Sequence, residues 1–409
     1  MADISILNVL LHGREIGTLT LLGGDRSLFS FNESYIEDAS RATLSLSFKD
    51  ELGELITDIA PTRTRVAPFF ANLLPEGQMR EYLTERAKVD PRREFFLLWV
   101  LGQDLPGALV VRPADGEQLP PDNGPEKDEE DRRESQEPLR FSLAGVQLKF
   151  SAVMNASGGL TIPVRGVGGD WVVKLPSSKF ENVPENEFAM MTLASQVGID
   201  IPDIKLISVS DIADLPGGIS DLGRHAFAIR RFDRTDQGPL HIEDFAQVFG
   251  LYPDEKYRKA SYRNIAEVIW AEVGEQGIAE FVRRLVFNTM IGNADMHLKN
   301  WSLIYLDRRN AALAPGYDFV STIVYLTDDR MALNYVRTKK FAEFSKDELA
   351  YLAAKAKLPG KLVMDTALET VERFHAVWRA GKSELGLPPK TIALIEEHIK
   401  RIPIATGPQ

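Results

Sequence analysis

IGNADMHLKNWSLIYLDRRNAALAPGYDFVST, residues 291–322, decides the fold because it places two polar turns around two short apolar runs. Before it, residues 278–290 repeat apolar side chains at helical spacing, which predicts a helix that ends at Gly292. The apolar runs at 301–306 and 311–314 predict a hairpin. The expected order is therefore a helix, a polar loop, a hairpin and a second polar turn.

Three oxygen-bearing side chains lie in the two polar turns. Asp295 and Asn300 belong to the loop after the helix, and Asp318 follows the hairpin. Phosphoryl transfer needs a carboxylate that orients the attacking hydroxyl, and hard oxygen ligands for the magnesium ion on the phosphates. The spacing therefore favours Asp295 as the catalytic carboxylate, with Asn300 and Asp318 as magnesium ligands. The competing interpretation is that these residues only punctuate loops, which Asp and Asn often do.

Two further side chains of this loop are candidates for contact with a nucleotide. His297 has no other His or Cys nearby to complete a transition-metal site, so a hydrogen bond that braces the loop is its expected role. Lys299 directly precedes Asn300, and the spacing leaves its role open.

The chain before this stretch predicts a β-rich lobe. Short strand-like runs, with glycines between them, occur at residues 139–142, 147–153, 160–163 and 171–175. A helix is expected at 184–197, strands return at 204–209 and 226–229, and the pattern beyond about residue 241 is mostly helical. An α+β fold with a β-rich lobe followed by a helical lobe would leave a cleft between the two.

Two segments of the β-rich lobe could contact phosphates. FSLAGVQLK, residues 141–149, could be a strand–turn–strand whose backbone N–H groups cover phosphates, but it lacks the G-x-x-x-x-G-K-[ST] signature, and a plain hairpin is the alternative. Lys174, in the apolar run WVVKL, lies either at a solvated edge or in the cleft. In the cleft, Glu187 of the next helix could hold it by an ion pair.

Composition divides the chain into four parts. They are an N-terminal α+β unit at 1–113, an acidic linker or mobile loop at 114–138, a β-rich nucleotide-binding lobe at 139–240 and a helical catalytic lobe at 241–409. The net charge is −11, and residues 115–137 contribute −7 of it through ten acidic and three basic side chains. Such a chain is not built to bind nucleic acid by global charge.

The chain contains no cysteine, which excludes disulfides and thiolate zinc sites. It begins without a basic leader and holds no apolar run long enough to span a membrane. We therefore expect a cytoplasmic location and no membrane partner.

Six spaced motifs stand out along the chain. They are FANLLPEG at 70–77, FSLAGVQLKF at 141–150, WVVKLP at 171–176, IRRFDR at 229–234, IGNADMHLKNWS at 291–302 and APGYDFVST at 314–322. Together they resemble the HipA family, the toxin serine/threonine kinases of bacterial toxin–antitoxin modules. The resemblance spans nearly the full chain and implies a protein-kinase-like bilobal fold and a kinase that uses ATP and Mg²⁺.

The resemblance also implies roles for individual residues. Asp295 matches the catalytic aspartate, Asn300 and Asp318 match the magnesium ligands, and Lys174 matches the lysine that contacts phosphate. The loop that covers the phosphates would consist of Ala144, Gly145, Val146, Gln147, Leu148 and Lys149. The backbone that meets adenine would be that of Arg230, Arg231 and Phe232. Ser142 aligns with the serine that family members phosphorylate on themselves, and a phosphoserine there would place about −2 of charge beside an anion site.

The partners that the resemblance implies are a small helix-turn-helix antitoxin, operator DNA reached mainly through that antitoxin, and a protein substrate from translation, such as an aminoacyl-tRNA synthetase. Two alternatives stay open on the sequence. One is a small-molecule kinase of the aminoglycoside or choline type, and the other is a catalytically silent module that completes a repressor complex. The chain departs from ordinary protein kinases at Asp318, which is followed by Phe319-Val320 in place of Phe-Gly, and at Lys299, which directly precedes Asn300.

Overall fold

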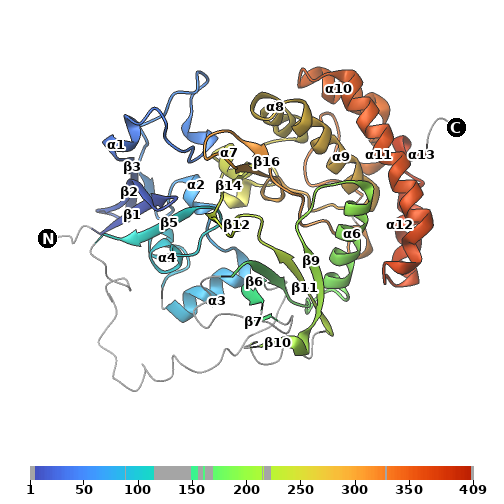
Figure 1. The fold of residues 1–409 in the computed structure, drawn as a ribbon, viewed down its shortest axis with the longest axis horizontal. Helices are drawn as coiled ribbons and strands as arrows, with labels where there is room; N and C mark the ends of the chain where they lie inside the picture. Colours follow the sequence, from blue (N-terminus) through green and yellow to red (C-terminus); the bar gives the residue numbers. More distant parts are fainter. Residues whose placement is uncertain are drawn as a thin grey trace.

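Three bodies of secondary structure follow one another along the chain in the computed structural model (Figure 1). The structure describes residues 5–87, 89–114, 149–154, 160, 161, 169–213, 215, 223–327 and 329–406. The predicted acidic segment at 114–138 lies outside these residues, except for residue 114. The strand expected at 139–142 also lies outside them.

The N-terminal unit is a five-stranded antiparallel sheet with four short helices. The strands, in the order β4-β3-β2-β1-β5, are β1 (Ile6–Leu11), β2 (Arg14–Leu22), β3 (Arg26–Phe31), β4 (Thr62–Arg63) and β5 (Leu109–Pro113). The helices are α1 (Glu33–Ile36), α2 (Pro68–Ala71), α3 (Gly77–Ala87) and α4 (Glu94–Leu101). Alternate strand residues and the aromatic side chains of α2 and α4 form a separate core, which includes Phe29, Phe70 and Phe96.

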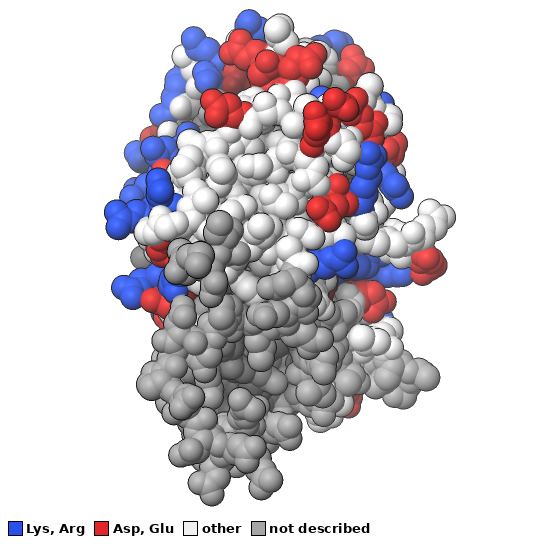
Figure 2. Space-filling view, turned by 90° about the vertical axis from the view of Figure 1, so that its left-hand side faces the viewer, with Lys and Arg blue, Asp and Glu red and all other residues white. Residues whose placement is uncertain are grey.

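Charge is unevenly spread over the side of the molecule that carries this unit. Figure 2 shows a broad central area there without Lys, Arg, Asp or Glu, bordered by charged side chains. The described part of this side therefore does not present a uniform negative surface, although the net charge is −11.

The second body is a mixed six-stranded sheet with one long helix against it. The strands, in the order β10-β7-β6-β8-β11-β9, are β6 (Lys149–Met154), β7 (Leu160–Thr161), β8 (Trp171–Lys174), β9 (Ile204–Ser208), β10 (Ile212–Ala213) and β11 (His225–Arg230). Helix α6 (Val183–Val197) has Pro184 in its first turn and ends at Gly198, whose φ of 96° suits a residue without a Cβ. The helix contacts β11 on the sheet and α11 (Gly360–Gly381) of the next body, so it joins the two lobes.

The third body is built around helix α9 (Glu275–Ile291), which contains the helix expected at 278–290. Every residue from 284 to 291 is buried, as in a helix at the centre of a core. The surrounding helices are α8 (Tyr262–Glu272), α10 (Lys346–Lys355), α11, α12 (Pro389–Ile399) and α13 (Pro403–Thr406). Within the described residues, no helix combines the length and apolar character needed to cross a bilayer.

Short strands connect the second and third bodies. A two-stranded pair, β12 (Arg234–Thr235) and β13 (Gly238–Pro239), leads into the sheet of β14 (His241–Asp244), β15 (Ser302–Tyr305) and β16 (Ala312–Leu313). Strands β15 and β16 form the hairpin that the sequence predicted. Helix α7 (Phe245–Val248) follows β14 directly.

The N-terminal unit is fastened to the helical lobe next to α7. Helix α2 packs against α7, the Nδ2 of Asn72 donates to the carbonyl of Leu251 at 2.7 Å, and Arg65 pairs with Asp254 at 2.8 Å. The carboxylate of buried Glu243 accepts hydrogen bonds from the Ser45 hydroxyl and the Leu46 N–H. The segment between α2 and α3 consequently lies beside the loop that follows α9.

Candidate active site

The loop that carries Asp295 begins where α9 ends. Gly292 closes the helix with a φ of 67°, and its N–H donates to the carbonyls of Asn288 and Thr289. A Cβ at this position would lie 2.7 Å from the side chain of Ile323, so the glycine also allows a close approach of two loops. The predicted stop signal therefore places the loop of Asp295 beside the turn that follows Asp318.

Asn293 ties these two loops together. Its Oδ1 accepts a hydrogen bond from the Asp295 N–H at 3.1 Å, and its Nδ2 donates to the Asp318 carbonyl at 3.1 Å and to the Asn288 Oδ1 at 2.8 Å. The side chain is buried with every one of these bonds made, so it holds a fixed geometry. Asp295 and Asp318 therefore lie in adjoining turns on the same side of the lobe. Asn293 could not be selected from the sequence, because its place after Gly292 also fits a simple helix stop.

Lys174 connects Asp318 to the β-rich lobe. It extends from β8, is buried, and forms ion pairs with the carboxylates of Asp318 and of Glu187 in α6, the second of which was expected from the sequence. Burial would lower the pKa of Lys174, but the two carboxylates outweigh that effect and raise the pKa above its ordinary value. Lys174 therefore connects the turn of Asp318 to helix α6 through two carboxylates.

Asp318 has a backbone conformation that residues other than glycine rarely adopt. Its φ of 59° lies in the left-handed region, which costs on the order of 1 kcal/mol even for Asp. The surrounding turn holds it there, because the Gly316 N–H donates to the Asp200 carbonyl at 2.7 Å and Phe319 is fully buried. Strained residues of this kind cluster at functional sites, which favours a functional role for Asp318 over simple loop punctuation.

Asn300 and Asp318 fit a magnesium ion in the type of donor they offer. The Nδ2 of Asn300 donates to the Asp295 carbonyl at 3.0 Å, so its amide oxygen is the atom that could face a cation. Carboxylate and amide oxygens are ligands that Mg²⁺ prefers, and Mg²⁺ commonly takes its other ligands from phosphates and water. In the part of the chain that the structure describes, no group of three or more His, Cys, Asp or Glu side chains could hold a metal.

Tyr257 covers the carboxylate of Asp295. Its hydroxyl donates to Asp295 Oδ1 at 2.6 Å, and burial, with the Asp295 charge, raises the pKa of the phenol. The ring of His297 meets the Tyr257 ring edge-on at 4.9 Å. Burial lowers the pKa of His297 to about 4, so the ring is neutral at pH 7. His297 contacts the loop through this ring pair, and its Nδ1 has no hydrogen-bond partner among the described residues.

Lys299 bonds to the N-terminal unit. Its Nζ donates to the Asn72 carbonyl at 2.9 Å and pairs with Glu76 Oε1 at 2.8 Å, while Glu76 Oε2 binds Lys256 at 2.8 Å. Burial would raise the pKa of Glu76, but the two lysines outweigh it and hold the pKa at about 2. Sequence reasoning missed Glu76, although it lies in the FANLLPEG motif.

The segment expected to meet adenine follows β11. The N–H groups of Arg230 and Arg231 donate to the carbonyls of Asp203 at 2.8 Å and Asp170 at 2.7 Å, so both are used within the protein. Phe232 packs with its ring 5.7 Å from that of Tyr317. Among the described residues, the Phe232 N–H has no backbone hydrogen-bond partner.

The expected phosphate-covering loop lies mostly outside the described residues. This applies to Ser142 and to Ala144, Gly145, Val146, Gln147 and Leu148. Lys149 is the first residue of β6, and the strand register sets it opposite Lys174 of β8. The expected loop is therefore connected to the strand that pairs with the one carrying the buried lysine.

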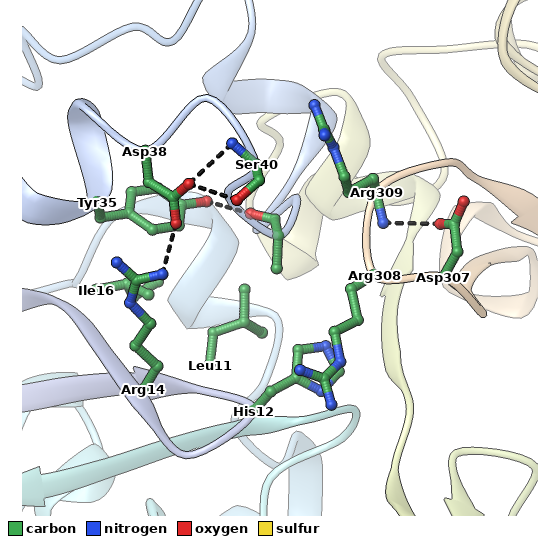
Figure 3. Close-up of a pocket in the computed structure, with 11 residues that line it drawn as sticks. Leu11, His12, Arg14, Ile16, Tyr35, Asp38, Ser40, Asp307, Arg308 and Arg309 are labelled. Atoms are coloured by element: carbon green, nitrogen blue, oxygen red, sulfur yellow. Dashed lines mark hydrogen bonds and ion pairs between the residues drawn. The ribbon is translucent and has the colours of Figure 1, made fainter.

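A cavity of about 280 Å³ lies where the N-terminal unit meets the β15–β16 turn (Figure 3). Arg14 pairs with Asp38 at its wall, and Asp307 accepts the backbone N–H of Arg309. None of the predicted site residues lines this cavity, so it does not extend the candidate active site.

Family models match both parts of the chain. Residues 7–112 match the HipA N-terminal domain, and residues 141–378 match the HipA-like C-terminal domain. The chain is 56% identical over 402 residues to "Putative kinase Y4dM" of Sinorhizobium fredii (strain NBRC 101917 / NGR234), with 97% of both chains covered. It is 26% identical over 338 residues to the serine/threonine-protein kinase toxin HipA of Shewanella oneidensis, covering 74% of this chain and 73% of that protein.

A solved structure shares the fold. It is the Shewanella oneidensis complex of HipA, HipB and operator DNA, which matches with a TM-score of 0.73 and 21% identity over 98% of this chain and 96% of that one. The predicted α+β, kinase-like bilobal fold is therefore confirmed.

Proposed function

Because this chain belongs to the HipA family, we propose that it is a serine/threonine-protein kinase that transfers the γ-phosphoryl group of ATP to a protein hydroxyl. The observation that carries the proposal is the buried side chain of Asn293, which joins the turns of Asp295 and Asp318. Phosphoryl transfer needs these two carboxylates near one another, one for the nucleophile and one for the metal on the phosphates.

In the proposed reaction Asp295 accepts the proton of the attacking hydroxyl. The hydroxyl oxygen forms a bond to the γ-phosphorus, and the bond from that phosphorus to the bridging oxygen breaks, so that ADP leaves. Lys174 would contact the phosphates, held in place by Glu187. A magnesium ion bound by Asn300 and Asp318 would supply further neutralisation of phosphate charge.

Tyr257 occupies a hydrogen-bonding position on Asp295 that a substrate hydroxyl would need. Its phenol donates to the carboxylate oxygen that would accept the proton of the substrate hydroxyl. We propose that a serine or threonine hydroxyl replaces this bond when a protein substrate binds.

Intact-mass spectrometry after incubation with Mg-ATP tests the proposal. The wild-type protein is expected to gain phosphoryl groups, including one at Ser142, whereas Asp295→Asn is expected to gain none and to unfold at the same temperature as wild type. Phosphorylation of a metabolite without any protein product would favour a small-molecule kinase. A folded wild-type protein that neither binds ATP nor gains mass would contradict kinase activity and favour a silent module.

We also propose the partners of a toxin–antitoxin module. The solved structure of the same fold contains HipA with HipB and operator DNA. This chain is accordingly expected to bind a small helix-turn-helix antitoxin, and operator DNA mainly through that antitoxin, in the cytoplasm. A translation component such as an aminoacyl-tRNA synthetase is the proposed substrate. An operator-shift assay with and without the antitoxin tests the DNA proposal, and a shift by this chain alone would contradict it.

A further inference from the structure

One carboxylate of the N-terminal unit contacts both segments that hold Asp295. Glu76 Oε1 pairs with Lys299 of the loop after α9, and Glu76 Oε2 pairs with Lys256 of the loop before α8, each at 2.8 Å. The three side chains are 16% to 35% exposed, so water screens these pairs only in part. A single side chain therefore sets the spacing between two loops of another lobe.

The Lys256 contact extends to the carboxylate of Asp295 itself. The next residue, Tyr257, donates to Asp295 Oδ1 at 2.6 Å, and the Lys256 carbonyl accepts the Leu298 N–H at 3.4 Å. The contact with Lys299 lies at the C-terminal end of the loop. The next residue, Asn300, donates from its Nδ2 to the Asp295 carbonyl at 3.0 Å. Asp295 is thus supported through both lysines that Glu76 holds.

Charge explains why a carboxylate is needed at this position. Without Glu76, two partly buried ammonium groups would face each other, and among the described carboxylates Asp244 would remain 4.0 Å from Lys299. A neutral residue at position 76 would leave the Asn72 carbonyl as the bond that still holds Lys299. Lys256 would then move away from Lys299 and carry Tyr257 with it.

Two other contacts between the N-terminal unit and the helical lobe lie away from the loop of Asp295. Arg65 pairs with Asp254 at 2.8 Å, and Gln247 Nε2 donates to the Phe69 carbonyl at 3.0 Å. These bonds fasten the unit, whereas Glu76 reaches the candidate catalytic loop directly. The Arg65–Asp254 pair is therefore a matched control, because it also joins the unit to the loop before α8.

We propose that Glu76 is a positioning residue for phosphoryl transfer, which sets the loop of Asp295 through Lys299 and Lys256. The proposal rests on the kinase function proposed above. It gives the N-terminal unit a part in the reaction, because that unit supplies the charge that completes the geometry of the catalytic loop.

Kinetics of ATP turnover by Glu76→Gln test the proposal. We expect kcat to fall by about 10- to 100-fold, since small displacements of a catalytic group cost rates of that order. The KM for ATP should change by less than about threefold, because Lys174 and Asp318 lie outside the loop that Glu76 contacts. In the control Asp254→Asn, kcat should stay within about twofold of wild type. Equal losses of kcat in the two variants would overturn the proposal.

A double-mutant cycle asks whether the effect passes through Lys299. Glu76→Gln should reduce kcat by a much smaller factor in the Lys299→Met variant than in the wild type, because the effects of two coupled residues are not additive. Full additivity of the two losses would overturn the proposed route.

Hydrogen exchange gives a readout that does not depend on activity. Amides of residues 293–301 should exchange faster in Glu76→Gln than in wild type or Asp254→Asn. Unchanged exchange in this loop would overturn the positioning role even if the wild-type protein proved inactive. An inactive wild type with faster loop exchange in Glu76→Gln would instead contradict the kinase proposal and retain the structural contact.

Discussion

Two lysine–carboxylate clusters support the candidate active site, and they are built in opposite ways. In the first cluster, Lys174 lies between the carboxylates of Asp318 and Glu187. In the second cluster, Glu76 lies between Lys256 and Lys299. The first cluster has two carboxylates around one lysine, whereas the second has two lysines around one carboxylate, with Asp244 4.0 Å from Lys299.

The difference indicates different tasks. Carboxylate oxygens suit a cation brought in with a nucleotide, so the proposed ligand would bind at the first cluster. The second cluster lies between two units of the protein, and its charges are paired by the protein itself. The first cluster should therefore affect nucleotide binding and chemistry, whereas the second should affect the position of a loop.

Among substitutions in the two clusters, Asp318→Asn should have the greatest consequence. Asparagine tolerates the left-handed φ of this position, so the backbone should be retained. Loss of the carboxylate should lower phosphoryl transfer by about 100- to 1000-fold, as removal of a charge-stabilising group does. Titration calorimetry should show weaker binding of Mg-ATP. Unchanged Mg-ATP affinity would contradict a metal-binding role for the first cluster.

Glu187→Gln should have the next largest effect, which should be a loss in the free energy of unfolding. Lys174 is 6% exposed and would keep Asp318 as its only carboxylate partner in the cluster, so the charge of a buried lysine would be less well compensated. We expect a loss of about 2–3 kcal/mol in the free energy of unfolding, measured with urea. The control is Glu369→Gln, because Glu369 pairs with Arg373 on the surface of α11. This variant should lose less than about 0.5 kcal/mol of unfolding free energy.

Glu243, a buried carboxylate at the joint of the two units, differs from both clusters because no described lysine or arginine pairs with it. Burial raises the pKa of Glu243 from 4.5 to about 7, although Ser45 and Tyr305 donate hydrogen bonds to it. A raised pKa means that the folded state holds the proton more tightly, so this contribution to stability is complete below pH 4.5 and is lost as the pH rises through about 7.

Glu243→Gln should therefore flatten the dependence of stability on pH. Between pH 5 and 8 the wild type should lose about 1–3 kcal/mol more unfolding free energy than the variant does. His241, whose pKa burial lowers to about 4, is present in both proteins and does not enter the difference. Parallel pH profiles would show that Glu243 is ionised throughout this range.

The smallest effect should come from Lys256→Met in the second cluster. Glu76 would keep Lys299, so we expect a loss of only about 0.5–1 kcal/mol in unfolding free energy. The KM for ATP should not change. A larger loss than that caused by Glu187→Gln would reverse the order of the two clusters and contradict the comparison.

Local sequence signals were sufficient for much of the fold. The helix that becomes α9, its stop at Gly292 and the hairpin of β15 and β16 all follow from spacing within about 40 residues. The spacing of Asp295, Asn300 and Asp318 within the same stretch also identified the two loops that carry these candidate site residues. The roles assigned to these three side chains stay predictions until the variants above are measured.

Contacts between distant segments could not be predicted in this way. Lys299 and Asn72 are 227 positions apart, and nothing in the local pattern of either segment selects the other. The link of Asn293 to Asp318 and the bond of Tyr257 to Asp295 depend on how two loops are placed in space. Composition likewise could not show that the N-terminal unit supplies a partner to the catalytic loop.

The joint at Glu243 has a practical consequence for inhibitor discovery. Ser45 and Leu46, from the first fifth of the chain, supply two of the hydrogen bonds to this carboxylate. A shortened protein that begins at residue 139 would expose Glu243 to water, and it would lack both Glu76 and the Asn72 carbonyl, which bind Lys299 in the loop of Asp295. Compounds selected against that fragment would be chosen for a loop geometry that the whole protein does not have.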